Sequence, residues 1–70
     1  MTVEITRADL LADLMETFSR SGCPATPTAA TRCHVRHPAA SSDREAWLEV
    51  AFFLRAWQLA HPGIAATLTM

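Results

Sequence analysis

Apolar residues recur at helical spacing in two parts of the chain. In the first part they fall within an arc of about 140° on a helical wheel, with acidic residues opposite. Thr6 precedes this run as an N-cap residue, and Ser21-Gly22 follows it as a stop signal. The pattern predicts an amphipathic helix over residues 6–20 with one buried face. The apolar residues of that face are Leu10, Leu11, Leu14, Met15 and Phe18.

A second helix is predicted over residues 43–60, because a capping signal marks its start. Ser42 stands at the N-cap position and Glu45 follows three residues later, which is the spacing of a capping box. The segment His61-Pro62-Gly63 ends the helix, since proline and glycine both break it.

This second helix is apolar on two sides. One strip repeats at spacings of three, four and three, as in a heptad seam. A second strip on the other side holds Leu48, Phe52 and Leu59. The surface helix of a monomer needs only one apolar face, so we expect the first strip to contact a partner. The predicted interface residues are Trp47, Val50, Phe53, Leu54 and Trp57.

Residues 21–41 are predicted to form a long ordered loop. Pro24, Pro27 and Pro38 make a continuous helix implausible there. The alternation within 31–36 allows one short strand. Residues 61–70 are expected to form a tail that covers part of the second helix.

Taken together, these patterns predict a mainly α fold for a single small helical domain over residues 1–70. A chain of this size buries only about 60% of its unfolded surface, so two helices rarely close a core alone. We therefore expect the two-helix unit to assemble as a homodimeric helical bundle of about four helices.

Composition and charge narrow the range of partners. The formal net charge is −1, all six basic residues are arginine, and they form no basic block. A nucleic-acid partner is not expected, because it requires a concentrated positive face. A membrane partner is not expected either, because the densest apolar run, 46–60, contains Glu49 and Arg55 and is shorter than a span of about 20 residues. The N-terminus lacks a signal-peptide pattern, so we expect a cytoplasmic protein.

Cysteine and histidine cluster in the predicted loop. Cys23, Cys33, His34 and His37 are all suitable zinc ligands, and four would close a tetrahedral site. Their spacing differs from that of zinc ribbons and fingers, which pair ligands more closely. His34 and His37 also point to opposite faces of an extended segment. The alternative is that the cysteines pack as small apolar groups, with no cofactor.

The sequence thus predicts a small non-enzymatic interaction protein, an accessory or regulatory subunit that binds itself as a homodimer or another protein subunit. The alternative from a different class is a small metal-binding or redox module, with zinc as the cofactor, built on the cysteine and histidine cluster. Catalysis by this chain is not expected, because no third group stands near Cys33 and His37 to orient them.

Overall fold

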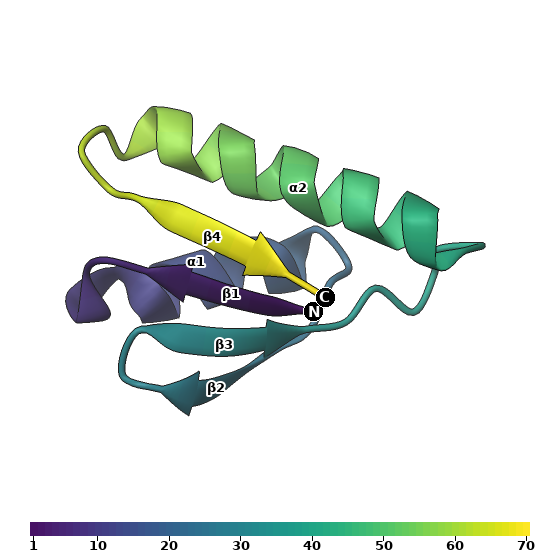
Figure 1. Ribbon diagram of the computed structural model, residues 1–70, viewed down its shortest axis with the longest axis horizontal. Coiled ribbons are helices and arrows are strands. Elements are labelled where there is room, and N and C mark those ends of the chain that lie inside the picture. The colour runs from purple at the N-terminus through teal and green to yellow at the C-terminus, as the bar shows by residue number, and fades with distance from the viewer.

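The computed structural model describes residues 1–70 and combines helices with a sheet (Figure 1). The chain forms two α-helices, a short 3-10 helix and four strands. Their order along the chain is β1 (Thr2–Ile5), η1 (Ala8–Leu10), α1 (Leu11–Arg20), β2 (Ala25–Ala29), β3 (Arg32–Val35), α2 (Asp43–Ala60) and β4 (Ala66–Thr69).

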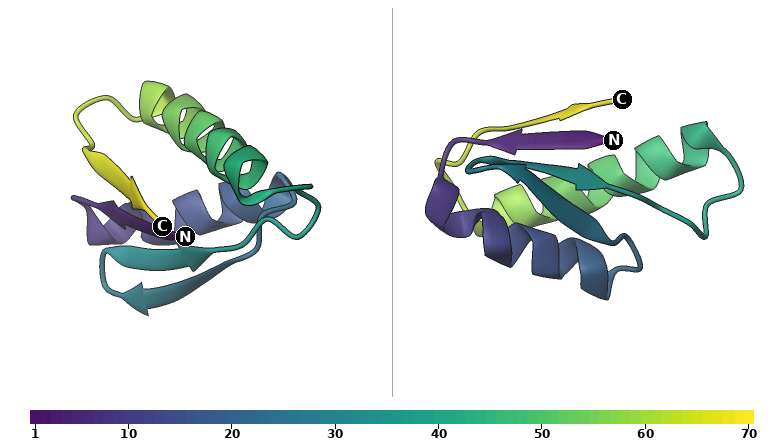
Figure 2. Two further views of the ribbon diagram at one scale, coloured as in Figure 1. Left: turned by 45° about the vertical axis from the view of Figure 1, so that its right-hand side comes forward. Right: turned by 90° about the horizontal axis from the view of Figure 1, so that it is seen from below.

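The four strands form one antiparallel sheet in the spatial order β2-β3-β1-β4. Both helices lie on the same face of this sheet (Figure 2). Strand β1 occupies the centre, where Val3 pairs with Cys33 on one side and with Leu68 on the other. The order β-α-β-β-α-β with this strand arrangement is the ferredoxin-like topology. Many unrelated functions occur on that topology, so it does not by itself indicate one.

The mainly α prediction is therefore wrong, and so is the homodimeric helical bundle derived from it. The chain is an α+β protein whose sheet supplies the layer that the second helix was expected to obtain from another copy. Three of the four strands, β1, β2 and β4, were not predicted. Of these, β1 and β4 are four residues each and pair with one another from opposite ends of the chain. Segments this short carry too little alternation to indicate a strand until their partner is known.

The predicted loop over 21–41 is also corrected, because most of it is a β-hairpin. Strand β3 coincides with the short strand allowed over 31–36, and it pairs with β2. Pro27 lies within β2 opposite Cys33. A proline is tolerated here because β2 is an edge strand and needs hydrogen bonds on one side only. The pairing shifts after Pro27, where the edge carries an irregularity.

The first helix begins later than predicted. Thr6 does not cap it, since its hydroxyl oxygen accepts a hydrogen bond from the Ala65 backbone N–H at 3.2 Å. At the other end, Gly22 has a φ of +83°, which glycine adopts without strain. The Cys23 N–H then donates to the Phe18 carbonyl at 2.9 Å, closing a Schellman motif that turns Cys23 into the core.

The second helix is confirmed at both ends. It spans Asp43–Ala60, and the Ser42 side chain accepts a hydrogen bond from the Glu45 N–H at 3.1 Å. The reciprocal bond of the capping box is absent, because the Glu45 carboxylate accepts instead from the Ser41 hydroxyl.

The core lies between the sheet and the two helices. The buried residues lie in β1, α1, β3 and α2, and one more, Cys23, lies in the turn after α1. Strand side chains that point away from the helices are polar, so the opposite face of the sheet is open to solvent. The buried residues are Val3, Ile5, Leu11, Leu14, Phe18, Cys23, Cys33, Val35, Val50, Leu54 and Trp57.

Candidate functional site

The four predicted metal ligands do not form one cluster. Cys33 is buried in the middle of β3, under the helices. His34 is the next residue of the same strand, so its side chain points to the open face of the sheet and is exposed. The structure contains no group of three or more His, Cys, Asp or Glu side chains placed to hold a metal ion. The geometry therefore gives no support to a zinc site on these residues.

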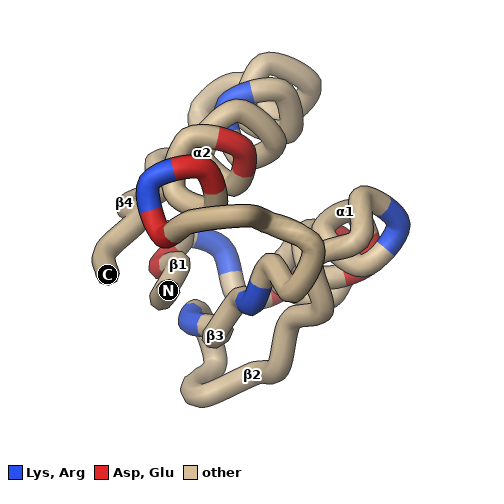
Figure 3. The backbone as a smooth tube through the Cα atoms, turned by 90° about the vertical axis from the view of Figure 1, so that its right-hand side faces the viewer, with Lys and Arg blue, Asp and Glu red and all other residues tan.

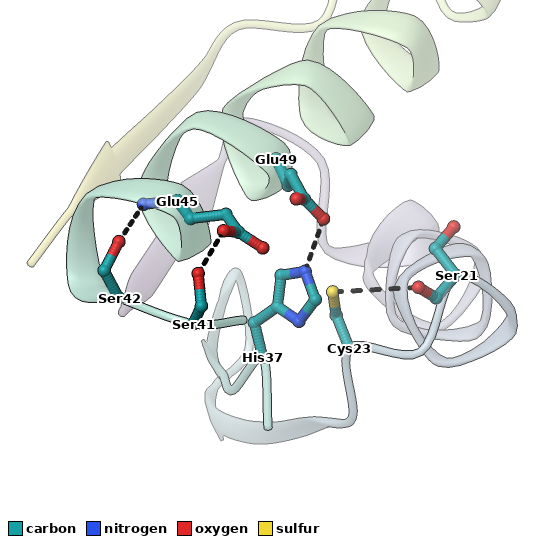
Figure 4. A network of polar contacts seen from close by, with 7 residues as sticks. All are labelled: Ser21, Cys23, His37, Ser41, Ser42, Glu45 and Glu49. Carbon is teal, nitrogen blue, oxygen red and sulfur yellow. Dashed lines mark hydrogen bonds and ion pairs between the residues drawn. The ribbon is translucent and has the colours of Figure 1, made fainter. Parts of the chain in front are cut away.

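Two of the four residues do come together with a third that the sequence analysis had not linked to them. Ala25 pairs with Val35, and the Arg36 N–H donates to the Pro24 carbonyl at 3.0 Å. Continuing this register places Cys23 opposite His37, just beyond the strands. Figure 4 shows the His37 ring beside Cys23 and below Glu49 of α2.

The His37 imidazole is fixed by a hydrogen bond from its Nε2 to a Glu49 carboxylate oxygen at 2.7 Å. Because a carboxylate accepts, Nε2 carries the proton and donates. The other ring nitrogen, Nδ1, is buried and has no hydrogen-bond partner. The His37 side chain is 8% exposed, so this contact joins the end of the hairpin to the middle of α2.

Neither cysteine is prepared for nucleophilic chemistry. Burial raises the pKa of the Cys33 thiol above 9.0, and it does the same for Cys23. The nearby negative charge of Glu49 raises the pKa of Cys23 further. Both thiols are fully buried and unpaired. A thiol with a raised pKa stays protonated and unreactive, so the arrangement is suited to packing and not to catalysis.

The predicted interface strip faces inward for most of its length. Val50, Leu54 and Trp57 are 0%, 5% and 4% exposed and pack in the core, which leaves them no surface for a partner. Trp47 and Phe53 are half-buried at its borders. We call Val50, Leu54 and Trp57 the inner face of α2.

Trp57 is further held by a polar contact to α1. Its indole Nε1 donates to a carboxylate oxygen of Asp13 at 2.8 Å. His61 stacks on Trp57 with ring centroids 4.1 Å apart and contacts the same Asp13 oxygen at 3.5 Å. The contacts of Trp57 and His61 with Asp13 therefore hold the C-terminal end of α2 against α1.

The opposite side of α2 carries the exposed apolar residues of the molecule. Leu48, Phe52 and Leu59 are 54%, 69% and 72% exposed, and on a helical wheel they fall within an arc of about 40°. Arg55 lies about 20° beyond Leu48 at the edge of this arc and forms no hydrogen bond or ion pair within the chain. We call Leu48, Phe52, Arg55 and Leu59 the outer face of α2. Both apolar strips of α2 were visible in the sequence. Their helical spacing alone did not reveal which of the two the sheet would cover.

The outer face borders a groove between the two helices. The groove has a volume of about 390 Å³, with Phe53, Ala56 and Ala60 on its α2 side and Thr17 and Arg20 on its α1 side. The Phe52 and Phe53 rings meet edge to face with centroids 6.0 Å apart, so the groove and the outer face form one surface. This continuity makes the outer side of α2 the candidate site.

Charge is dispersed over the molecule. Acidic and basic residues alternate in the first turn of α2, and both signs occur on the side of the molecule that Figure 3 shows. The open face of the sheet carries threonines, the single imidazole ring of His34 and an ion pair between Glu4 and Arg32 at 2.8 Å, with no Phe, Tyr or Trp. Neither the first turn of α2 nor the open face of the sheet offers the aromatic stacking platform or the positive groove that single-stranded nucleic acid requires.

Length and hydropathy together leave no helix of this structure able to cross a membrane. Comparisons with protein-family models, with curated proteins and with solved structures each find no match to this chain.

Proposed function

We propose that this protein is a small non-enzymatic interaction protein, an accessory or regulatory subunit that associates through the outer face of α2. One observation carries the proposal. Three large apolar side chains on a single helix are more than half exposed and share a narrow arc. Single exposed apolar residues are common, but a contiguous strip bordered by polar groups is typical of an interaction surface.

The rest of the molecule supports a binding role more than a catalytic one. The two thiols are buried with raised pKa values, and the His37 Nε2 bonds to Glu49 and not to a thiol or hydroxyl group. The partner we propose is a protein, since the open sheet face and the helices lack the features that nucleic acid requires. We assign the protein to the cytoplasm, which is consistent with two free cysteines.

The proposal is tested by removing one anchor from the outer face. We expect Phe52→Ser to weaken association at least tenfold, because a buried phenylalanine side chain contributes about 1.5–3 kcal/mol and 1.4 kcal/mol corresponds to a factor of ten. Association is measured by sedimentation of the purified chain and by quantitative affinity capture from an extract of the source organism.

Met70→Ser is the matched control, because Met70 is 75% exposed and lies off the outer face. Like Phe52→Ser, it replaces an exposed apolar side chain by serine. The proposal fails if the wild-type chain neither self-associates nor retains a protein at fixed stoichiometry. It also fails if such association persists in Phe52→Ser, or if Met70→Ser abolishes it as well.

A further inference from the structure

We propose that the free edge of β4 binds an extended, acidic segment of another protein, which joins the sheet as a further strand. This surface is separate from the outer face of α2, so it adds a second binding site to the proposed function. Strand addition to an exposed edge is a common mode of peptide recognition, because main-chain hydrogen bonds hold the peptide and neighbouring side chains select its sequence.

The strand register identifies which backbone groups of β4 point inward. Met1 and Val35 exchange both backbone hydrogen bonds, at 2.7 and 3.0 Å, so Met1 and every second residue after it bond to β3. Glu4 lies between those residues and therefore bonds to β4, where its partner is Thr67. The N–H and C=O of Thr67 are thus used within the sheet.

The residues on either side of Thr67 point outward. Ala66 and Leu68 direct their N–H and C=O groups away from β1, and no strand lies beyond β4 to pair with them. One earlier carbonyl of the same row, that of Ile64, accepts a hydrogen bond from the Gln58 side chain at 3.5 Å. The edge therefore offers two donors and two acceptors at the spacing of an antiparallel strand.

The opposite edge of the sheet is protected, whereas this one is not. The Arg36 N–H donates to the Pro24 carbonyl, so Ala25 and Pro27 are the residues of β2 that point outward. Proline has no N–H, and the pairing of β2 is irregular just after Pro27. Proteins blunt free edges with prolines, charges and bulges of this kind. Strand β4 carries none of the three, so its edge is open to a partner strand.

One side of α2 borders the open edge. Gln58 reaches the Ile64 carbonyl, so the side of the helix that carries Gln58 faces β4, and α1 lies on the other side (Figure 3). On a helical wheel Trp47 and Ala51 fall within about 20° of Gln58. Both residues are half-buried, so a strand added along β4 covers apolar surface that the single chain leaves exposed.

Charges beside the edge favour an acidic partner over a second copy. Arg44 and Arg55 lie on this side of α2 and are exposed. Glu45 and Glu49 lie 140° or more around the wheel from its centre, and Asp43 is an acid only at the first residue of the helix. Two copies joined edge to edge would bring their arginine-bearing sides face to face, and like charges oppose association. Carboxylates on an added strand would instead meet an unpaired arginine.

Arg55 stands close to the open backbone groups. Helix α2 and strand β4 run antiparallel (Figure 1). From the contact between Gln58 and Ile64, three residues back along α2 cover about 4.5 Å, and two residues onward along β4 cover about 6.6 Å. Arg55 and Ala66 therefore lie at similar heights. An acidic side chain on the helix side of the added strand reaches Arg55 while its backbone bonds to the edge.

The probe is a fluorescein-labelled peptide of four Glu-Val repeats, titrated with the full chain and followed by fluorescence anisotropy. Ala66→Pro removes one outward N–H and keeps the bonds to β1, since proline is tolerated where the N–H of an edge strand faces solvent. We expect it to weaken binding about tenfold or more. Ala25→Pro makes the same change at an outward position of β2 and should leave the affinity unchanged. Circular dichroism checks the fold of both variants.

The choice of an acidic partner is tested by reversing one charge. Arg55→Glu should weaken binding of the Glu-Val peptide about fivefold and strengthen binding of a Lys-Val peptide of the same length. Arg20→Glu makes the same change in net charge at an exposed arginine of α1 and should have little effect. Equal effects of the two variants would overturn the assignment of Arg55 to the site.

Hydrogen exchange followed by NMR reads the edge in the unsubstituted chain and decides even where Ala66→Pro fails to fold. The amides of Ala66 and Leu68 should exchange fast in the free chain and slowly with the Glu-Val peptide, while that of Thr67 is protected in both. A peptide that does not bind, or that leaves the two outward amides unprotected, overturns the inference. Protection of these amides through self-association without peptide overturns the acidic partner. Phe52→Ser should bind the peptide unchanged, so this site and the outer face are judged separately.

Discussion

The inner and outer faces of α2 can be distinguished by one substitution made at two positions. Leu54 is 5% exposed and Leu59 is 72% exposed, and both lie in the same helix. Leu→Ala changes intrinsic helix propensity by less than about 0.7 kcal/mol at either site, so a larger difference in stability reports burial.

The structure sets the expected magnitudes. Replacing a buried leucine by alanine costs about 2–5 kcal/mol, whereas an exposed substitution stays within about 0.5 kcal/mol. A domain of this size is stable by about 4–10 kcal/mol, so Leu54→Ala removes roughly a fifth of the total or more. Leu59→Ala should leave the stability of the single chain nearly unchanged.

Urea unfolding followed by tryptophan fluorescence and far-ultraviolet circular dichroism measures both variants. With a denaturant slope of about 1 kcal/mol per molar, the urea midpoint for Leu54→Ala falls by about 2–5 M. The experiment uses a low protein concentration, so that association through Leu59 does not contribute. Equal midpoints, or a larger loss for Leu59→Ala, would refute the assignment of the inner face to the core.

Three further outcomes follow from single contacts. Ser42→Ala should lower the free energy of unfolding by about 1 kcal/mol through loss of the N-cap, while Ser19→Ala, an exposed serine in α1, should not; thermal unfolding measures both. Burial raises the pKa of the Cys33 thiol in the folded chain. The protonated thiol therefore contributes fully to stability below its unfolded-state pKa near 9.0, and this contribution is lost as pH rises through the folded-state pKa. Stability should therefore decline in alkali, Cys33→Val should reduce that decline, and a disulfide-exchange reagent should label the cysteines only in urea. Hydrogen bonds from Thr31 and Arg32 lower the pKa of the Glu4 carboxyl. The contribution of Glu4 to stability is therefore present above its unfolded-state pKa of about 4.5 and is lost as pH falls through the folded-state pKa. Glu4→Gln should flatten the acid limb of the stability profile, and an unchanged limb would contradict this.

The local signals in the sequence were sufficient for what local interactions determine. The capping serine and the stop at His61-Pro62-Gly63 define α2, because a cap satisfies backbone groups of its own helix. The apolar arc of α1 was likewise visible, and the alternation over 31–36 indicated β3.

Tertiary structure alone decided the sheet and therefore the surface. Strands β1 and β4 exist because residues 2–5 and 66–69 satisfy each other's backbone hydrogen bonds, a pairing that neither segment indicates alone. The same holds for His37 and Glu49, which the hairpin and α2 bring within 2.7 Å. Both strips of α2 have helical spacing, so periodicity could not say which one is buried. The sheet covers Val50, Leu54 and Trp57, and this choice leaves Leu48, Phe52 and Leu59 at the surface.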